Sequence, residues 1–99
     1  MLVKDASECG GSEVQKPHTF EAEKCAEICY GVSTMFAFGT NDYGNPRCNK
    51  DGCTCLCETA ATSDGTCNIQ DNTGYRLYRI YQEYKHLGNT KIIYAIVIE

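Results

Sequence analysis

Residues 20–31, Phe-Glu-Ala-Glu-Lys-Cys-Ala-Glu-Ile-Cys-Tyr-Gly, and residues 53–57, Cys-Thr-Cys-Leu-Cys, carry the strongest structural signal in this chain. Cys25 and Cys29 are four residues apart, so a helix places both thiols on one face, one turn from each other. In the second stretch the cysteines alternate, so a strand turns all three thiols to one face and the two intervening residues to the other. The two stretches predict a helix that disulfides join to a strand.

The number of cysteines predicts a disulfide framework. Eight cysteines in 99 residues indicate four bridges and an oxidising compartment, so we expect a secreted protein. Two helix-to-strand bridges are expected, from Cys25 and Cys29 to two of the three strand cysteines, Cys53, Cys55 and Cys57. A local bridge between Cys48 and Cys53 would leave Cys9 to pair with Cys67. These are expectations within about 105 possible pairings.

The length of the chain is sufficient for a single domain, residues 1–99. We expect an α+β fold in which one helix, from an N-cap at Thr19 to Tyr30, packs across an antiparallel sheet of four to five strands. Phe20 and Ile28 recur at helical spacing with the cysteines and are expected on the same apolar face. The breaker-rich segments are expected to be loops, namely residues 9–17, 39–52 and 58–74.

The second half of the chain leaves one element open. Residues 75–81 have high strand propensity, but the apolar residues between 75 and 87 also fit a helical stripe. We favour a strand through Tyr81, followed by a turn at residues 86–90. Residues 91–98 are apolar on both faces, which is typical of a central strand, and residues 2–3 are a candidate neighbour for it.

Metal sites were considered as alternatives to disulfides. Zinc could use the cysteines, but alternating strand positions match poorly the two-to-four-residue spacing of structural zinc sites. Asp64, Asp71 and Asn72 could suggest calcium, but they lack the spacing of an EF-hand loop. We expect neither a metal nor another cofactor.

The motifs of common enzymes are not found in this sequence. The two histidines, His18 and His86, lie in turn-like surroundings, and no nucleophile elbow, zinc-protease motif or phosphate loop is found. An even number of cysteines leaves no obvious thiol nucleophile. We therefore predict that the chain is not an enzyme.

The charge and hydropathy limit the classes of partner. The formal net charge of −4 disfavours nucleic acid, because few phosphates could be neutralised. We interpret the only candidate basic patch, Arg76, Arg79, Lys85 and His86, as ordinary solvated side chains. The longest apolar stretch, residues 92–98, is too short to cross a bilayer, so no membrane insertion is expected.

Four segments together resemble a PAN/apple domain, a member of the plasminogen–apple–nematode family. They are residues 20–31, Met35-Phe-Ala-Phe-Gly, the Cys-x-Cys-x-Cys strand and Gly74-Tyr-Arg-Leu-Tyr-Arg-Ile. The resemblance covers roughly residues 9–81, although the chain lacks a family cysteine near residues 32–34. It implies a helix that is stapled to the central strand of a small antiparallel sheet. It also implies a binding module for proteins or carbohydrates.

Two surfaces are candidates for ligand binding. The loop of residues 41–47 combines an amide, a carboxylate, an aromatic ring and a guanidinium group, a composition that suits sugar hydroxyls or a protein epitope, with Asn41, Asp42, Tyr43 and Arg47 as the candidate residues. Tyrosines recur every three residues from Tyr75, so a strand should expose at least one of Tyr78 and Tyr81. Exposed tyrosine is favoured at interfaces.

The predicted function is extracellular recognition of a protein or carbohydrate ligand by surface loops on a rigid scaffold. A first alternative is a structural or assembly unit that forms a homodimer through the C-terminal strand at a sheet edge. A second alternative is a secreted effector, such as an inhibitor or toxin, whose affinity would reside in one rigid loop.

Overall fold

The computed structural model of the chain describes residues 2–87 and 90–96. Within them lie one helix, α1 (Ala22–Cys29), and ten strands, namely β1 (Leu2–Lys4), β2 (Ser7–Cys9), β3 (Val14–Thr19), β4 (Met35–Gly39), β5 (Cys48–Asn49), β6 (Gly52–Cys57), β7 (Ile69–Asp71), β8 (Tyr75–Arg79), β9 (Tyr81–Leu87) and β10 (Thr90–Ile96). The main sheet has the strand order β1-β8-β4-β6-β3, with β5 paired to β6, and all its pairings are antiparallel. The predicted α+β class is therefore confirmed. The main sheet has six strands rather than four to five.

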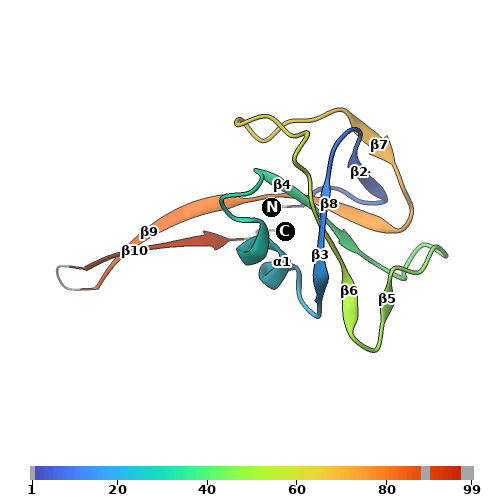
Figure 1. The fold of residues 1–99 in the computed structure, drawn as a ribbon, viewed down its shortest axis with the longest axis horizontal. Coiled ribbons are helices and arrows are strands. Elements are labelled where there is room, and N and C mark those ends of the chain that lie inside the picture. The colour runs from blue at the N-terminus through green and yellow to red at the C-terminus, as the bar shows by residue number, and fades with distance from the viewer. Residues whose placement is uncertain (1, 88–89, 97–99) are drawn as a thin grey trace.

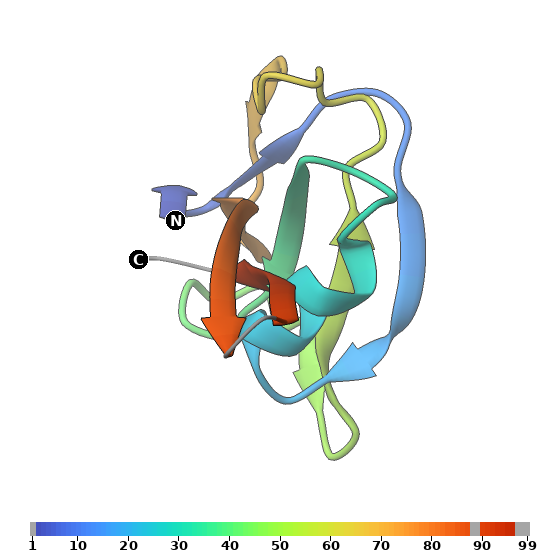
Figure 2. The same ribbon diagram turned by 90° about the vertical axis from the view of Figure 1, so that its left-hand side faces the viewer.

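The sheet is covered on both faces (Figures 1 and 2). Helix α1 packs on β3, β4 and β6, and this face holds a core of Phe36, Tyr78, Ala26 and the four stapling cysteines. The two-stranded sheet of β2 and β7 covers the opposite face, where Cys9, Met35 and Leu77 form a second cluster. Leu56 packs with Ala37 and Tyr75, apart from the strand cysteines, as the alternation in β6 predicts.

The disulfides join these layers. Cys25 bonds to Cys55 and Cys29 to Cys57, with Cα atoms 5.6 and 5.3 Å apart, so two bridges fix α1 to β6. The other two bridges are Cys9–Cys67 and Cys48–Cys53. These pairings agree with those expected from the sequence, and they include every cysteine of the chain, so none offers a thiolate for zinc or for catalysis.

The helix begins later than predicted. Its N-cap is Glu21 rather than Thr19, and Thr19 instead ends β3 and donates its hydroxyl to the carbonyl of Glu21 at 3.1 Å. As a result Phe20 precedes the helix and is 75% exposed, while Ile28 is 38% exposed. The prediction that both side chains share the buried face of the cysteines is therefore wrong.

All three segments predicted as loops contain strands. Strand β5 lies in the segment of residues 39–52 and pairs with β6. Val14, Gln15 and Lys16 pair with β6, although the segment ends in Pro17. Proline is tolerated here because β3 lies at the edge of the sheet and its register shifts between Lys16 and Thr19. Likewise β7 lies within the predicted loop of residues 58–74, where it pairs with β2. Pairing with a partner strand outweighs the local breaker composition in all three places.

The C-terminal strand lies elsewhere than predicted. Strand β10 pairs with β9 in a separate two-stranded sheet and is not a central strand. Leu2 and Lys4 of β1 pair with Tyr78 and Leu77 of β8 instead. Because β1 and β4 occupy the two edges of β8, the main sheet has no position beside β8 for β10. Residues 97–98 of the predicted strand lie outside the described residues.

The open element at residues 75–87 is resolved in favour of strand. It forms β8 and β9, with Ile80 between them. The backbone N–H of Ile80 donates to the carbonyl of Thr34 at 3.0 Å. The helix alternative is wrong. Of the predicted turn at residues 86–90, positions 88–89 lie outside the described residues. Leu87 and Thr90, which flank these two positions, are paired with each other in the β9–β10 ladder.

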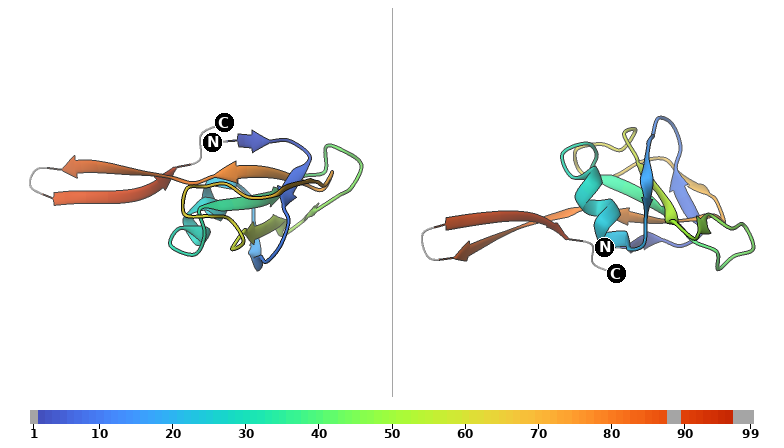
Figure 3. Two further views of the ribbon diagram at one scale, coloured as in Figure 1. Left: turned by 90° about the horizontal axis from the view of Figure 1, so that it is seen from above. Right: turned by 60° about the horizontal axis from the view of Figure 1, so that its bottom comes forward.

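The ribbon of β9 and β10 extends away from the main sheet as an arm, beginning beside α1 (Figure 3).

Within the residues that the structure describes, no helix has the length and apolar character needed to cross a membrane.

Candidate functional site

A hollow of about 650 Å³ lies between the start of α1 and the loop that follows β4. Phe38 and Tyr78 form its apolar part. Its polar lining comes from the helix start, the loop and β8, through Glu21, Glu23, Thr40, Asn41, Asp42 and Arg76. The disulfide between Cys48 and Cys53 forms one wall. The hollow thus combines a rigid wall with side chains from three elements.

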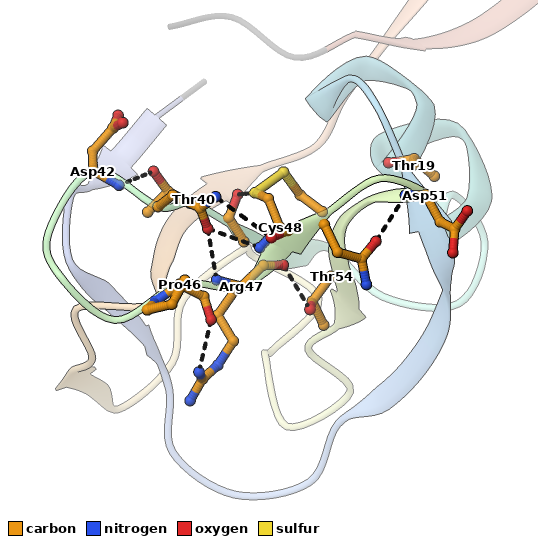
Figure 4. Close-up of a disulfide and its surroundings, with 12 residues drawn as sticks. Thr19, Thr40, Asp42, Pro46, Arg47, Cys48, Asp51 and Thr54 are labelled. Carbon is orange, nitrogen blue, oxygen red and sulfur yellow. Dashed lines mark hydrogen bonds between the residues drawn. A yellow bond between two sulfur atoms is a disulfide. The ribbon is translucent and has the colours of Figure 1, made fainter.

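The loop of residues 41–47, which Figure 4 draws around the disulfide, is held by the side-chain amide of Asn41. The Oδ1 atom of Asn41 accepts the backbone N–H groups of Arg47 and Cys48, both at 2.9 Å. The carbonyl of Arg47 in turn accepts the backbone N–H and hydroxyl of Thr54, at 3.0 and 3.1 Å. Asn41 lines the hollow, but its side-chain oxygen is already used to shape the loop.

Arg76 connects the loop to the sheet. Its guanidinium group donates to Asp42 at 2.6 Å and to Asp5 at 2.8 Å. It also donates to the hydroxyl of Tyr43 at 3.3 Å and lies over that ring, 5.4 Å from the centroid. The hydrogen bond and charge of Arg76 lower the pKa of Asp42, which therefore stays ionised. Arg76 is thus no ordinary solvated cation of a basic patch.

The predicted ligand residues fall into separate groups. Asp42 and Asn41 line the hollow, and Tyr43 lies next to it through Arg76. Arg47 does not line the hollow, because its guanidinium group lies 5.7 Å from the ring centroid of Tyr75 and belongs to the other face of the sheet.

The two candidate tyrosines are less accessible than predicted. Tyr78 lines the hollow, but it is only 2% exposed and stacks on Phe36 with ring centroids 5.0 Å apart, so it belongs mainly to the core. Tyr81, the first residue of β9, is half-buried. Both faces of the sheet are covered, so the strand period alone does not tell which tyrosine is exposed.

The acidic wall of the hollow is not among the surfaces predicted from the sequence. Glu21 and Glu23 lie at the start of the helix, and both line the hollow together with Asp42. Arg76 is the only cation among the lining residues, and two carboxylates already contact it. This charge balance suits a hydroxyl-rich or cationic group rather than an anion. The one signal for this wall in the sequence is that the helix start lies only a few residues before Cys25, which is disulfide-bonded to the sheet.

A second, apolar hollow of about 440 Å³ adjoins the first and shares Glu21 with it. It lies along α1, where Phe20, Ile28, Lys24 and Glu27 are among its lining residues. An exposed aromatic ring beside an aliphatic side chain is typical of protein interfaces. The two hollows form one continuous surface around the helix start, here termed the helix-start surface.

The other residues singled out from the sequence have structural contacts. Asp71 pairs with Lys4 at 3.7 Å and Asn72 donates its amide to Glu8, and in the described residues neither forms a ligand cluster with Asp64. His18 is half-buried in β3, and the side chain of His86 lies outside the described residues. Comparison with models of known families, with curated proteins and with solved structures gives no match to this chain.

Proposed function

We propose that this chain is an extracellular recognition domain of the PAN/apple type that binds a protein or carbohydrate ligand at the helix-start surface. The observation that carries this proposal is the hollow between Glu23, Asp42 and Arg76, whose wall is fixed by a disulfide. Fixed polar groups around a partly apolar hollow can recognise a ligand without a large ordering cost.

The four bridges support an extracellular location, because disulfides persist in oxidising compartments. The two disulfides from α1 to β6 support the PAN/apple assignment, because members of that family also have a helix that disulfides join to the sheet. Neither hollow holds a nucleophile beside a base: no histidine lines it, and the cysteines in its wall are bonded to each other. Recognition is therefore a better fit to this surface than catalysis.

The experiment is a screen of the purified chain on a glycan array and on an array of secreted proteins. Binding found in either screen is then measured with the variant Glu23→Lys, which reverses a charge in the first hollow. We expect affinity to fall at least tenfold. The matched control Asp64→Lys reverses an exposed carboxylate outside both hollows and should bind like the wild type.

The variant Phe20→Ser separates the two ligand classes. A protein that docks across both hollows should lose affinity with Phe20→Ser, whereas a glycan seated in the polar hollow should not. Absence of any ligand in both screens, or equal affinity of Glu23→Lys and the wild type, would contradict the proposal.

Assembly through the C-terminal strand is a second candidate function, and the topology of the arm favours it. Within the described residues β10 has β9 as its only partner strand, so its other edge presents unpaired backbone groups. The sequence Thr90–Ile96 is largely apolar and β-branched. Sedimentation equilibrium over a wide range of concentrations should then show a mass that rises toward the dimer. A constant monomer mass would rule this function out.

A further inference from the structure

Three glutamates from separate segments meet on the side of the molecule that β2 covers. Glu8 belongs to β2, Glu13 directly precedes β3, and Glu58 directly follows β6. One carboxylate oxygen from each lies within 4.8 Å of the other two. This cluster shares no residue with the helix-start surface, so it is independent of the function proposed above.

Glu58 is the buried member of the cluster. Its side chain is 0% exposed, and its Oε2 atom accepts the backbone N–H of Cys9 at 2.7 Å. Its Oε1 atom is also buried and has no hydrogen-bond partner among the described residues. A buried oxygen without a partner costs on the order of 1–3 kcal/mol, so such groups are rare unless a ligand satisfies them.

No side-chain cation neutralises the three carboxylates within the described part of the chain. The ion pairs found there join Lys4 to Asp71, Lys24 to Glu27, and Arg76 to two aspartates. In the described residues Glu8 accepts the neutral amide of Asn72 and shares a hydrogen bond with the carboxyl group of Glu13. Three acidic groups at this separation repel one another unless a cation or protons lie between them.

We propose that Glu8, Glu13 and Glu58 bind a calcium ion that ties β2 and the start of β3 to the end of β6. The ligand atoms are all carboxylate oxygens, which hard divalent cations prefer. Oxygens on opposite sides of a calcium ion are about 4.6–5.2 Å apart, whereas those around magnesium are no more than about 4.2 Å apart. The three oxygens lie no more than 4.8 Å from one another, within the span of a calcium coordination sphere. Magnesium is less suitable, because it needs near-ideal octahedral geometry and gives up its water reluctantly.

The competing occupant of the cluster is a proton. Burial, followed by the charges of Glu13 and Glu8, raises the pKa of Glu58 to about 8, although the hydrogen bond from Cys9 acts in the opposite direction. A proton satisfies one carboxylate, whereas a divalent ion can contact all three. The experiment has to tell these two occupants apart.

The test uses the full chain, freed of metal with a chelator and dialysed to neutral pH. Calorimetric titration with calcium chloride should give one site with a dissociation constant of about 10⁻⁴–10⁻³ M, the range of extracellular modules. Calcium at about ten times that constant should raise the thermal midpoint by several degrees, and magnesium at the same concentration should raise it less.

The variant Glu13→Gln removes one ligand from an exposed position and so spares the fold. It should weaken calcium binding at least tenfold, while the matched control Asp64→Asn should leave it unchanged. Absence of a calcium response in the wild type would overturn the proposal. An equal response in Glu13→Gln, or an equal response to magnesium, would overturn it too, because each would indicate nonspecific charge screening.

Discussion

The carboxyl group of Glu58 lies fully buried and faces Glu8 and Glu13. Its pKa of about 8 in the folded chain is well above the value of 4.5 for an ordinary glutamate. Burial and the charge of Glu8 also raise the pKa of Glu13, and a hydrogen bond between the two carboxyl groups acts in the same direction. The folded protein without metal therefore binds protons more tightly than the unfolded chain.

This linkage predicts the pH dependence of stability in a buffer that contains a chelator. Below about pH 4.5 Glu58 is protonated in both states, and its contribution to stability is fully present. Stability should fall by roughly 2–4 kcal/mol as the pH rises toward 8, because the unfolded chain loses its proton first. Urea unfolding at a series of pH values measures this slope.

The variant Glu58→Gln should flatten most of the slope, and Asp64→Asn should keep it. A smaller slope should remain in Glu58→Gln, because the pKa of Glu13 is also raised in the folded chain. A wild-type stability that rises between pH 4.5 and 8 would contradict the assignment of Glu58 as a protonated buried acid.

Asn41 has a second residue-scale consequence, because one oxygen atom fixes two backbone donors of the binding loop. Asn41→Ala should speed amide exchange of Arg47 and Cys48 at least tenfold and cost about 1 kcal/mol of stability. Asn49→Ala, which loses only the hydrogen bond from the backbone of Asp51, is the matched control. Unchanged exchange at Arg47 and Cys48 would show that the disulfide alone orders the loop.

At the scale of elements, the four disulfides enclose very different lengths of chain. The bridge from Cys9 to Cys67 spans 58 residues, whereas the bridge from Cys48 to Cys53 spans five. A longer loop loses more entropy in the unfolded chain when it is closed. Replacement of Cys9 and Cys67 by alanine should therefore cost about 4 kcal/mol, against about 2 kcal/mol for Cys48 and Cys53.

Urea denaturation of the two double-alanine variants measures this difference. Equal losses would mean that strain or residual structure, rather than loop length, governs the contribution of each bridge.

The elements that the sequence predicted are those whose signals are local. The four-residue spacing of Cys25 and Cys29 and the alternation in β6 depend only on the geometry of one element, so the staple was predictable. Strand β3 was not, because Pro17 suppresses its local signal and its pairing with β6 is what forms it. The placement of Tyr78 and Phe20 depended on which faces other elements cover, and no local pattern contains that information.

The candidate site shows the same division at the scale of the whole molecule. Asn41 and Asp42 belong to one short polar loop and were predictable as candidates. Arg76 in β8 lies 34 residues after Asp42, and Glu23 in α1 lies before Asp42 in the chain, so only the fold brings them to the same hollow. The acidic cluster of Glu8, Glu13 and Glu58 likewise depends on the convergence of three segments.

The whole molecule also depends on its bridges, because a chain of 99 residues buries too little surface for a large margin of stability. We therefore expect the fully reduced and alkylated chain to be unfolded already at about 25 °C. Heating it from that temperature should give no cooperative transition by circular dichroism. The oxidised chain in the same buffer is the control. A sigmoidal transition after reduction would show that the two cores suffice without the disulfides.

The arm has a mechanical consequence. Every bridge lies between Cys9 and Cys67, so no covalent loop encloses β9 and β10. Tension applied at Ile96 would unzip the ribbon one residue pair at a time, and the chain would lengthen by roughly 50 Å before the load reached β8. Strand β8, which is hydrogen-bonded on both edges, then resists. The protein would respond to stretching as a compliant tether joined to a stiff, cross-linked body.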